Sequence, residues 1–98
     1  MADTVENNAA ASRFELSEDG HVAELVYRLT GDRLVLEHTG VPEELGGRGT
    51  GGKLVQAAVD HAAANNLTIV PECPFARGWL EKHPDAVAHV TIDWPAPS

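Results

Sequence analysis

The chain has 98 residues, of which 43% are apolar, and a formal net charge of −8 at neutral pH. This length supports one domain with a single core. A strongly acidic chain is poorly suited to nucleic acid, whose phosphates require a basic surface, and no apolar run approaches the ~20 residues that cross a membrane. A single cysteine excludes internal disulfides and multi-cysteine metal sites. No secretory signal is visible, so we expect a cytoplasmic protein that contacts neither nucleic acid nor membrane.

The charge is unevenly distributed along the chain. Residues 1–45 contain ten acidic and three basic side chains, whereas residues 46–98 contain five acidic and four basic ones. The later cations, Arg48, Lys53, Arg77 and Lys82, favour an anionic ligand in the second half. The acidic first half favours a basic substrate such as an amine.

The first part of the chain predicts an antiparallel meander after a tail. Residues 1–12 are polar and acidic and are predicted to be disordered, and the domain is predicted to span residues 13–93. Alternating apolar residues and intervening turn signals predict strands over residues 13–16, 21–29 and 33–41.

Two details of these strands bear on the site. Val26 breaks the alternation of the second strand and indicates a bulge there. In the third strand, alternation places Leu34, Leu36 and His38 on one face.

The second part of the chain predicts a strand–helix–strand unit. A helix is predicted over residues 50–65, a buried parallel strand over residues 67–70, a second helix over residues 74–83 and a final strand over residues 87–92. Residues 94–98 are predicted to be a C-terminal tail. The predicted fold class is therefore α+β, an antiparallel meander followed by a β-α-β unit and a second short helix. Phe75 and Trp79 lie four apart on that helix and are predicted to pack against the sheet.

A glycine-rich turn opens the first predicted helix. Five of the seven residues from Gly46 to Gly52 are glycine, and an apolar helical pattern follows at once. The backbone N–H groups of such a turn point in one direction, and the positive end of the helix dipole adds to them. This arrangement predicts a phosphate site.

Two general phosphate motifs overlap this turn. Gly47, Gly49 and Gly52 fit the dinucleotide pattern G-x-G-x-x-G, but a polar connection and an antiparallel meander precede them instead of a buried parallel strand. Gly47 and Gly52-Lys53 also match the start of a P-loop, but Leu54 stands where a magnesium-binding Ser or Thr is required. Both interpretations are weak.

A third interpretation fits the order of the predicted elements. Gly46-Gly47-Arg48-Gly49-Thr50-Gly51 resembles the pyrophosphate loop of the Gcn5-related N-acetyltransferases, Arg/Gln-x-x-Gly-x-Gly/Ala, with Gly46 at the Arg/Gln position. Together with Val41-Pro-Glu-Glu-Leu45, Val70-Pro-Glu-Cys-Pro-Phe75 and Glu81-Lys-His-Pro-Asp85, it resembles the small single-domain proteins of that superfamily, the YjdJ type. The resemblance covers about residues 12–93.

The resemblance implies a compact acetyltransferase fold that binds acetyl-CoA or CoA. It implies that the strand ending at Val41 splays from its neighbour and leaves a wedge for pantetheine. It also assigns the pyrophosphate to the glycine turn, so that the implied cofactor-binding residues are Val41, Gly46, Gly47, Arg48, Gly49, Thr50, Gly51, Gly52 and Lys53.

Cys73 and His38 are the main candidates for catalysis, and Glu72 is a second candidate for the base. Cys73 precedes the second helix, whose N-terminus would stabilise a thiolate that accepts the acetyl group, although a buried structural cysteine is the alternative. His38 lies on the strand beside the implied wedge and could deprotonate an amine, or it could be a surface residue. The other histidines show no metal-ligand spacing, so no metal is predicted.

These features predict an acetyl-CoA-dependent N-acetyltransferase that acts on a primary amine of a small molecule or protein. The alternative is a non-catalytic module that binds CoA or a protein partner.

Overall fold

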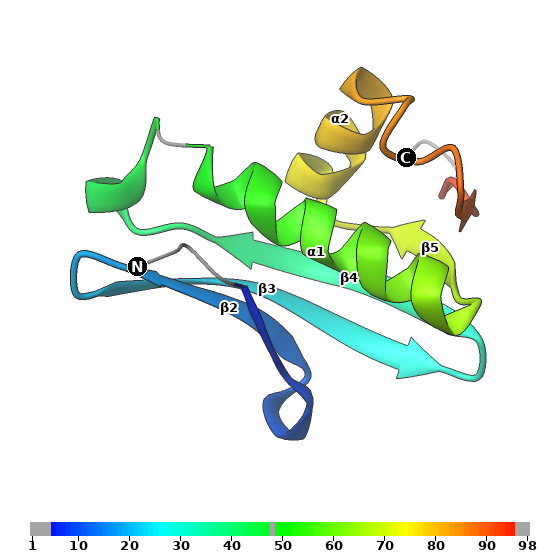
Figure 1. Ribbon diagram of the computed structural model, residues 1–98, viewed down its shortest axis with the longest axis horizontal. Coiled ribbons are helices and arrows are strands. Elements are labelled where there is room, and N and C mark those ends of the chain that lie inside the picture. The colour runs from blue at the N-terminus through cyan, green and yellow to red at the C-terminus, as the bar shows by residue number, and fades with distance from the viewer. Residues whose placement is uncertain (1–4, 48, 96–98) are drawn as a thin grey trace.

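The structure is a computed structural model that describes residues 5–47 and 49–95. Its elements form a single mixed sheet with two α-helices (Figure 1). In chain order, they are β1 (Glu6–Asn8), the 3₁₀ turn η1 (Ala9–Ala11), β2 (Arg13–Glu18), β3 (His21–Thr30), β4 (Arg33–Gly40), the 3₁₀ turn η2 (Glu43–Leu45), α1 (Thr50–Asn65), β5 (Thr68–Pro71), α2 (Pro74–Lys82) and β6 (Thr91–Ile92). The predicted α+β class is confirmed.

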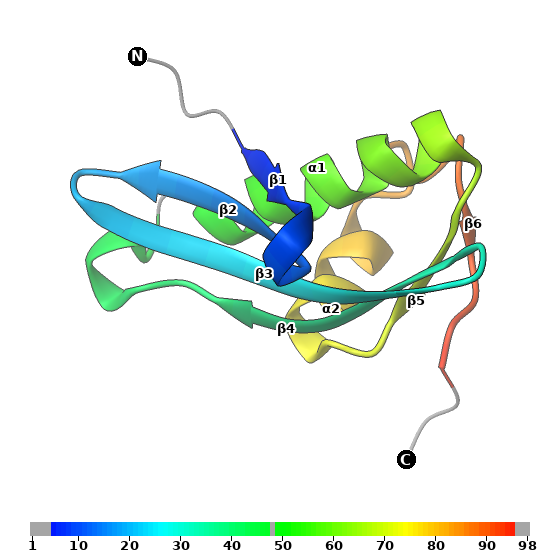
Figure 2. The same ribbon diagram turned by 90° about the horizontal axis from the view of Figure 1, so that it is seen from below.

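The strands lie in sequence order across the sheet, from β1 to β6. Strands β1 to β4 pair antiparallel, and β4, β5 and β6 pair parallel. The predicted meander and β-α-β unit therefore meet at β4. Figure 2 shows the long β2, β3 and β4 running beneath α1.

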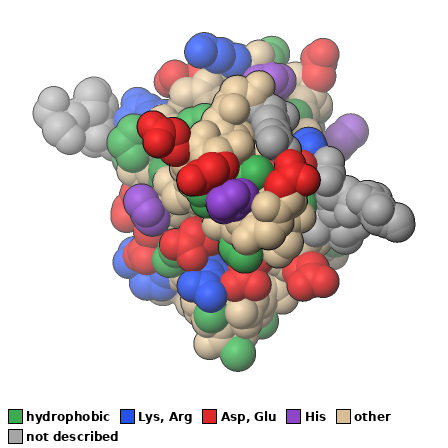
Figure 3. All heavy atoms as spheres, turned by 90° about the vertical axis from the view of Figure 1, so that its left-hand side faces the viewer, with side chains coloured by type: hydrophobic (Ala, Val, Ile, Leu, Met, Phe, Trp, Pro, Cys, Tyr) green, Lys and Arg blue, Asp and Glu red, His purple; other side chains and the backbone are tan. Residues whose placement is uncertain are grey.

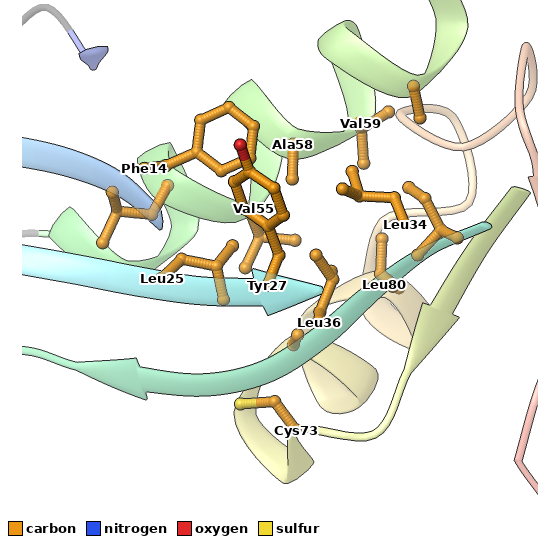
Figure 4. Packing of buried hydrophobic residues seen from close by; sticks show 14 of the residues in the cluster. Phe14, Leu25, Tyr27, Leu34, Leu36, Val55, Ala58, Val59, Cys73 and Leu80 are labelled. Carbon is orange, nitrogen blue, oxygen red and sulfur yellow. The ribbon is translucent and has the colours of Figure 1, made fainter. Parts of the chain in front are cut away.

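The core lies between the sheet and the helices (Figure 4). Alternate residues of the strands and the apolar stripe of α1 are fully or almost fully buried there, together with Ala76 and Leu80 from α2. Burial of each large apolar side chain contributes about 1.5–3 kcal/mol relative to exposure. The strand members of this cluster are Phe14, Leu16, Ala23, Leu25, Tyr27, Leu34, Leu36 and Ile69.

The N-terminal segment differs from the predicted disordered tail. Residues 6–8 form β1, which pairs with β2 through its backbone. The Tyr27 hydroxyl donates to Asn7 Oδ1 at 2.7 Å, and Val5 packs against the core. Polar composition concealed this edge strand because backbone pairing, the Tyr27 hydrogen bond and the contact of Val5 hold it. The tail positions 1–4 and 96–98 lie outside the described residues.

A bulge displaces the register between β3 and β4. Tyr27 pairs with Leu36, whereas the preceding residue, Val26, pairs with His38, so Glu37 is the extra residue. The predicted bulge therefore exists, but the extra residue is in β4 and not in β3. Beyond it, Thr39 pairs with the fully buried Leu25. Thr39, and not His38, consequently continues the core face of Leu36.

The first helix has the predicted bounds, and the second ends one residue earlier, at Lys82. Asn66 ends α1 in the left-handed conformation, with φ of 55°, and donates its N–H to Ala62. The predicted last strand is reduced to Thr91–Ile92. Backbone bonds from Ala86 to His83 and from Val90 to Val87 coil the chain into turns before it. The valines of this segment pack against the core from turns, which explains why their spacing resembled a strand.

Candidate functional site

A cleft of about 1030 Å³ lies at the N-terminal end of α1. The glycine turn and α1 supply most of its lining, the end of β4 supplies one wall, and α2 supplies an aromatic wall. The described lining residues are Val5, Thr39, Val41, Gly46, Gly47, Gly49, Thr50, Gly51, Gly52, Lys53, Gln56, Ala57, Asp60, Phe75 and Trp79. Eight of the predicted cofactor-binding residues are among them; the ninth, Arg48, lies outside the described residues.

The turn presents unsatisfied backbone donors to the cleft. Gly47 and Gly49 have φ of 80° and 76°, a left-handed conformation that residues with a Cβ rarely adopt. Gly49 is the N-cap of α1, and within the described residues no side chain caps this end. The first helical bond runs from the Lys53 N–H to the Gly49 carbonyl at 3.1 Å. Among the described residues, no acceptor takes up the preceding N–H groups, from Thr50 to Gly52, which are the donors that a helix start offers to an anion.

The last two glycines of the turn have a packing role. A Cβ on Gly51 would lie 2.6 Å from Cζ of Phe75, and a Cβ on Gly52 would lie 2.6 Å from Nε1 of Trp79. Phe75 and Trp79 therefore pack against α1 and line the cleft. The contact with α1 was not part of the predicted packing against the sheet. The signal for this contact was a pair of adjacent glycines in the first turn of one helix and two aromatics on one face of the other.

The cleft continues to an opening between β4 and β5. Their paired register ends at Leu36 and Pro71, and the Cys73 N–H then donates to the Leu36 carbonyl at 2.9 Å. Beyond this point β5 turns into α2, while β4 runs on to Gly40 without a β5 partner in the described register. Thr39 and Val41 line the cleft along this open edge. An extended ligand could pair with the exposed backbone there.

Cys73 lies behind this edge. Its side chain is 3% exposed and does not line the cleft, and its Sγ is 3.2 Å from the hydroxyl oxygen of Thr39. Figure 4 shows Cys73 at the start of α2, below the ribbon of β4. Sequence reasoning missed Thr39 because strict alternation, without the bulge at Glu37, assigns it to the wrong face.

His38 lies on the opposite face of the sheet from the cleft. It is exposed, and a Cβ on Gly40 would be 3.5 Å from both its Nε2 and Cγ of Glu24. The structure therefore brings together the eight described cofactor-binding residues but does not bring the two predicted catalytic residues into the same cleft. Within the described lining, the titratable side chains are those of Lys53 and Asp60.

The surroundings of the turn are acidic. Figure 3 looks at this end of the molecule and shows acidic side chains spread across it. The Lys53 ammonium pairs with Glu18 at 3.4 Å, and His21 Nδ1 lies 3.9 Å from Glu44. Among the described residues, no group of three or more acidic, histidine or cysteine side chains is arranged to hold a metal ion.

Comparison with known proteins gives the class of this fold and site. Residues 13–90 match the family described as GCN5-related N-acetyl-transferase. The chain is also similar to the NMR solution structure of a GCN5-like protein from Staphylococcus aureus, with a TM-score of 0.71 and 32% sequence identity. That match covers 100% of this chain and 94% of the other.

The chain therefore belongs to the GCN5-related N-acetyltransferase family, as its glycine turn and Cys-Pro-Phe segment predicted.

Within the described ranges, α1 and α2 are too short or too polar to cross a membrane.

Proposed function

We propose that this protein transfers an acetyl group from acetyl-CoA to a primary amine. The observation that carries the proposal is the continuity of one cleft from the anion-binding turn to the open edge of β4. Phosphate and pantetheine, two chemically distinct parts of CoA, would each meet a suitable surface along it. Neither a dinucleotide fold nor a P-loop domain provides this combination.

The chain offers specific groups to each part of the cofactor. The N–H groups of Thr50, Gly51 and Gly52 would bind the pyrophosphate, and the positive φ of Gly47 and Gly49 keeps the turn open beside them. The backbone beside Thr39 and Val41 would pair with the pantetheine amides. Phe75, which is 47% exposed, would supply apolar contact from the other wall.

Acetyl-CoA supplies the acetyl group as a thioester. In the transfer, a nitrogen–carbon bond forms, the carbon–sulfur bond breaks, the amine loses a proton and the departing sulfur gains one. Direct attack by the amine is the favoured route, since the Cys73 thiol is buried behind Thr39. A backbone N–H on the open edge of β4 would stabilise the carbonyl oxygen. His38 is a candidate base for an amine that approaches from the opposite face of the sheet.

The placement of His38 and Cys73 favours one alternative. Because neither lines the cleft, a module that binds CoA without catalysis is the second candidate function. The two functions share the cofactor site and differ in the acceptor.

Calorimetric titration with acetyl-CoA, NAD and ATP tests the shared site, and we expect binding of acetyl-CoA alone. Binding of NAD or ATP in its place would overturn the proposal. Release of CoA thiol in the presence of a panel of amines then tests catalysis. Amine-dependent thiol release supports the transferase, whereas tight binding with no release for any amine supports the non-catalytic module.

A further inference from the structure

Glu18 is a buried carboxylate that the proposed reaction does not use. It ends β2 on the same face as Phe14 and Leu16, beneath α1, and its side chain is only 8% exposed. An ionised carboxylate at such a position is costly unless it is paired and hydrogen-bonded. Its partners therefore indicate why the chain places it there.

Both partners come from the first turn of α1. The Thr50 hydroxyl donates to Oε1 at 2.8 Å, and the Lys53 ammonium lies 3.4 Å from Oε2. Thr50 is 1% exposed, so this hydroxyl is committed to Glu18 and directed away from solvent. Thr50 and Lys53 both line the cleft, whereas Glu18 does not. The carboxylate thus contacts the cofactor-binding turn from behind.

This position has two physical consequences for an anion in the cleft. The two contacts hold the first turn of α1, and with it the donor N–H groups, against the end of β2. At the same time, the carboxylate occupies Lys53 and places a negative charge next to the same helix terminus that would attract a phosphate. The first effect fixes the donor groups in place, and the second repels a negatively charged ligand.

We propose that Glu18 is a positioning residue that lowers the affinity of the turn for phosphate groups and so limits the retention of the CoA product. The inference rests on the proposed function. It assigns a role to a carboxylate outside the cleft, acting through Thr50 and Lys53.

The substitution Glu18→Gln separates the two effects. The amide keeps a carbonyl oxygen to accept the Thr50 hydrogen bond but removes the negative charge and its ion pair with Lys53. We expect CoA to bind roughly three- to tenfold more tightly, the order expected for removing a nearby charge in a partly screened site. The affinity for pantetheine, which carries no phosphate, should remain unchanged.

Two variants control for other causes. Glu15→Gln removes the same charge from the same strand on the opposite face, and it should leave the affinity for CoA unchanged. Glu18→Asp shortens the side chain but keeps the charge, so it should perturb the contacts without tightening CoA binding. If Glu18→Gln alone does not fold, the comparison is made in a Gly78→Ala background, where the added methyl has open space in α2.

The outcomes distinguish this proposal from the proposed function. Equal or weaker CoA binding by Glu18→Gln, or parallel tightening for pantetheine, would overturn the role of Glu18. Absence of CoA binding to the unsubstituted chain would instead overturn the acetyltransferase proposal. In steady-state acetylation, the Glu18→Gln variant should lower KM for acetyl-CoA and also lower kcat if CoA release limits turnover.

Discussion

The ring of Phe75 packs against Gly51 so closely that a Cβ on Gly51 would lie 2.6 Å from Cζ of the ring. The same relationship recurs one residue later between Gly52 and the indole of Trp79. The glycine run therefore serves two purposes. Gly47 and Gly49 allow the backbone conformation of the turn, and Gly51 and Gly52 leave room for the aromatic side chains of α2. The contact between α1 and α2 is also part of the wall of the cleft.

Replacing Gly51 with alanine should destabilise the domain. The new methyl would collide with the Phe75 ring, and because this ring is 47% exposed and can shift, the rearrangement should cost about 1 kcal/mol. Thermal unfolding followed by circular dichroism measures this loss. Because Phe75 would shift within the cleft, acetyl-CoA should also bind more weakly in calorimetry.

A matched control lies on the other helix. Gly78 is a helical glycine of α2, and a Cβ there would meet nothing within 4 Å. Gly78→Ala should therefore stabilise the domain by roughly 0.5–1 kcal/mol, since alanine restricts the unfolded chain and favours a helix. A similar loss of stability for both alanine variants would contradict the steric explanation.

Substitution of Gly49 should weaken cofactor binding. Its φ of 76° is in the left-handed region, where alanine costs about 1–2 kcal/mol. We expect Gly49→Ala to lower the affinity for acetyl-CoA by at least several-fold, because the N-cap and the N–H groups after it would reorient. Calorimetry with acetyl-CoA and with pantetheine shows whether the loss is specific to the phosphate end, as expected. An unchanged acetyl-CoA affinity would argue against the turn as the phosphate site.

Replacing Cys73 with alanine should leave acetyl-CoA affinity within about twofold of the original. The thiol is buried and does not line the cleft, so its loss should reduce stability by about 1 kcal/mol through packing and the Thr39 contact. Amine acetylation should persist if the amine attacks directly. Loss of turnover with intact binding would instead support a thiol that carries the acetyl group.

The Arg13–Glu15 pair should stabilise the domain at neutral pH, and this stabilisation should be lost at acidic pH. Hydrogen bonds from Arg13 and Asn8 to the carboxylate hold the pKa of Glu15 below its ordinary value of 4.5. Because the folded-state pKa is depressed, the contribution is present above the unfolded value and is lost as the pH falls through the folded value. Unfolding titrations should show the stability difference between the unsubstituted chain and Glu15→Gln shrinking below about pH 4.5. A difference that stays constant to lower pH would contradict this assignment.

The elements with strong local signals were predictable from sequence. The glycine run sets where α1 begins, and Asn66 marks where it ends, because a left-handed residue closes the last turn. The α2 start followed from Pro74 at a first helical position. The lining of the cleft by Gly46, Gly47 and residues 49–53 was also predictable, since adjacent residues at a helix start remain adjacent in space.

The features that depend on pairing between distant segments were not predictable in the same way. The β1 strand is held by backbone bonds to β2 and by the Tyr27 hydroxyl, neither of which leaves a compositional signal. The location of the bulge was missed because Val26 only reveals that the register slips, not which strand carries the additional residue. That single ambiguity exchanged Thr39 and His38 between the two faces.

The bulge at Glu37 divides β4 into two segments with different roles. The part up to Leu36 builds the core and pairs with β5, and the part after the bulge faces the cleft. If Glu37 were instead a regular paired position of the strand, alternation would turn His38 toward the cleft and Thr39 toward the open side of the sheet. The side chain that β4 offers to the cleft is thus decided by whether one backbone position is bulged or paired, without altering any side chain of the core.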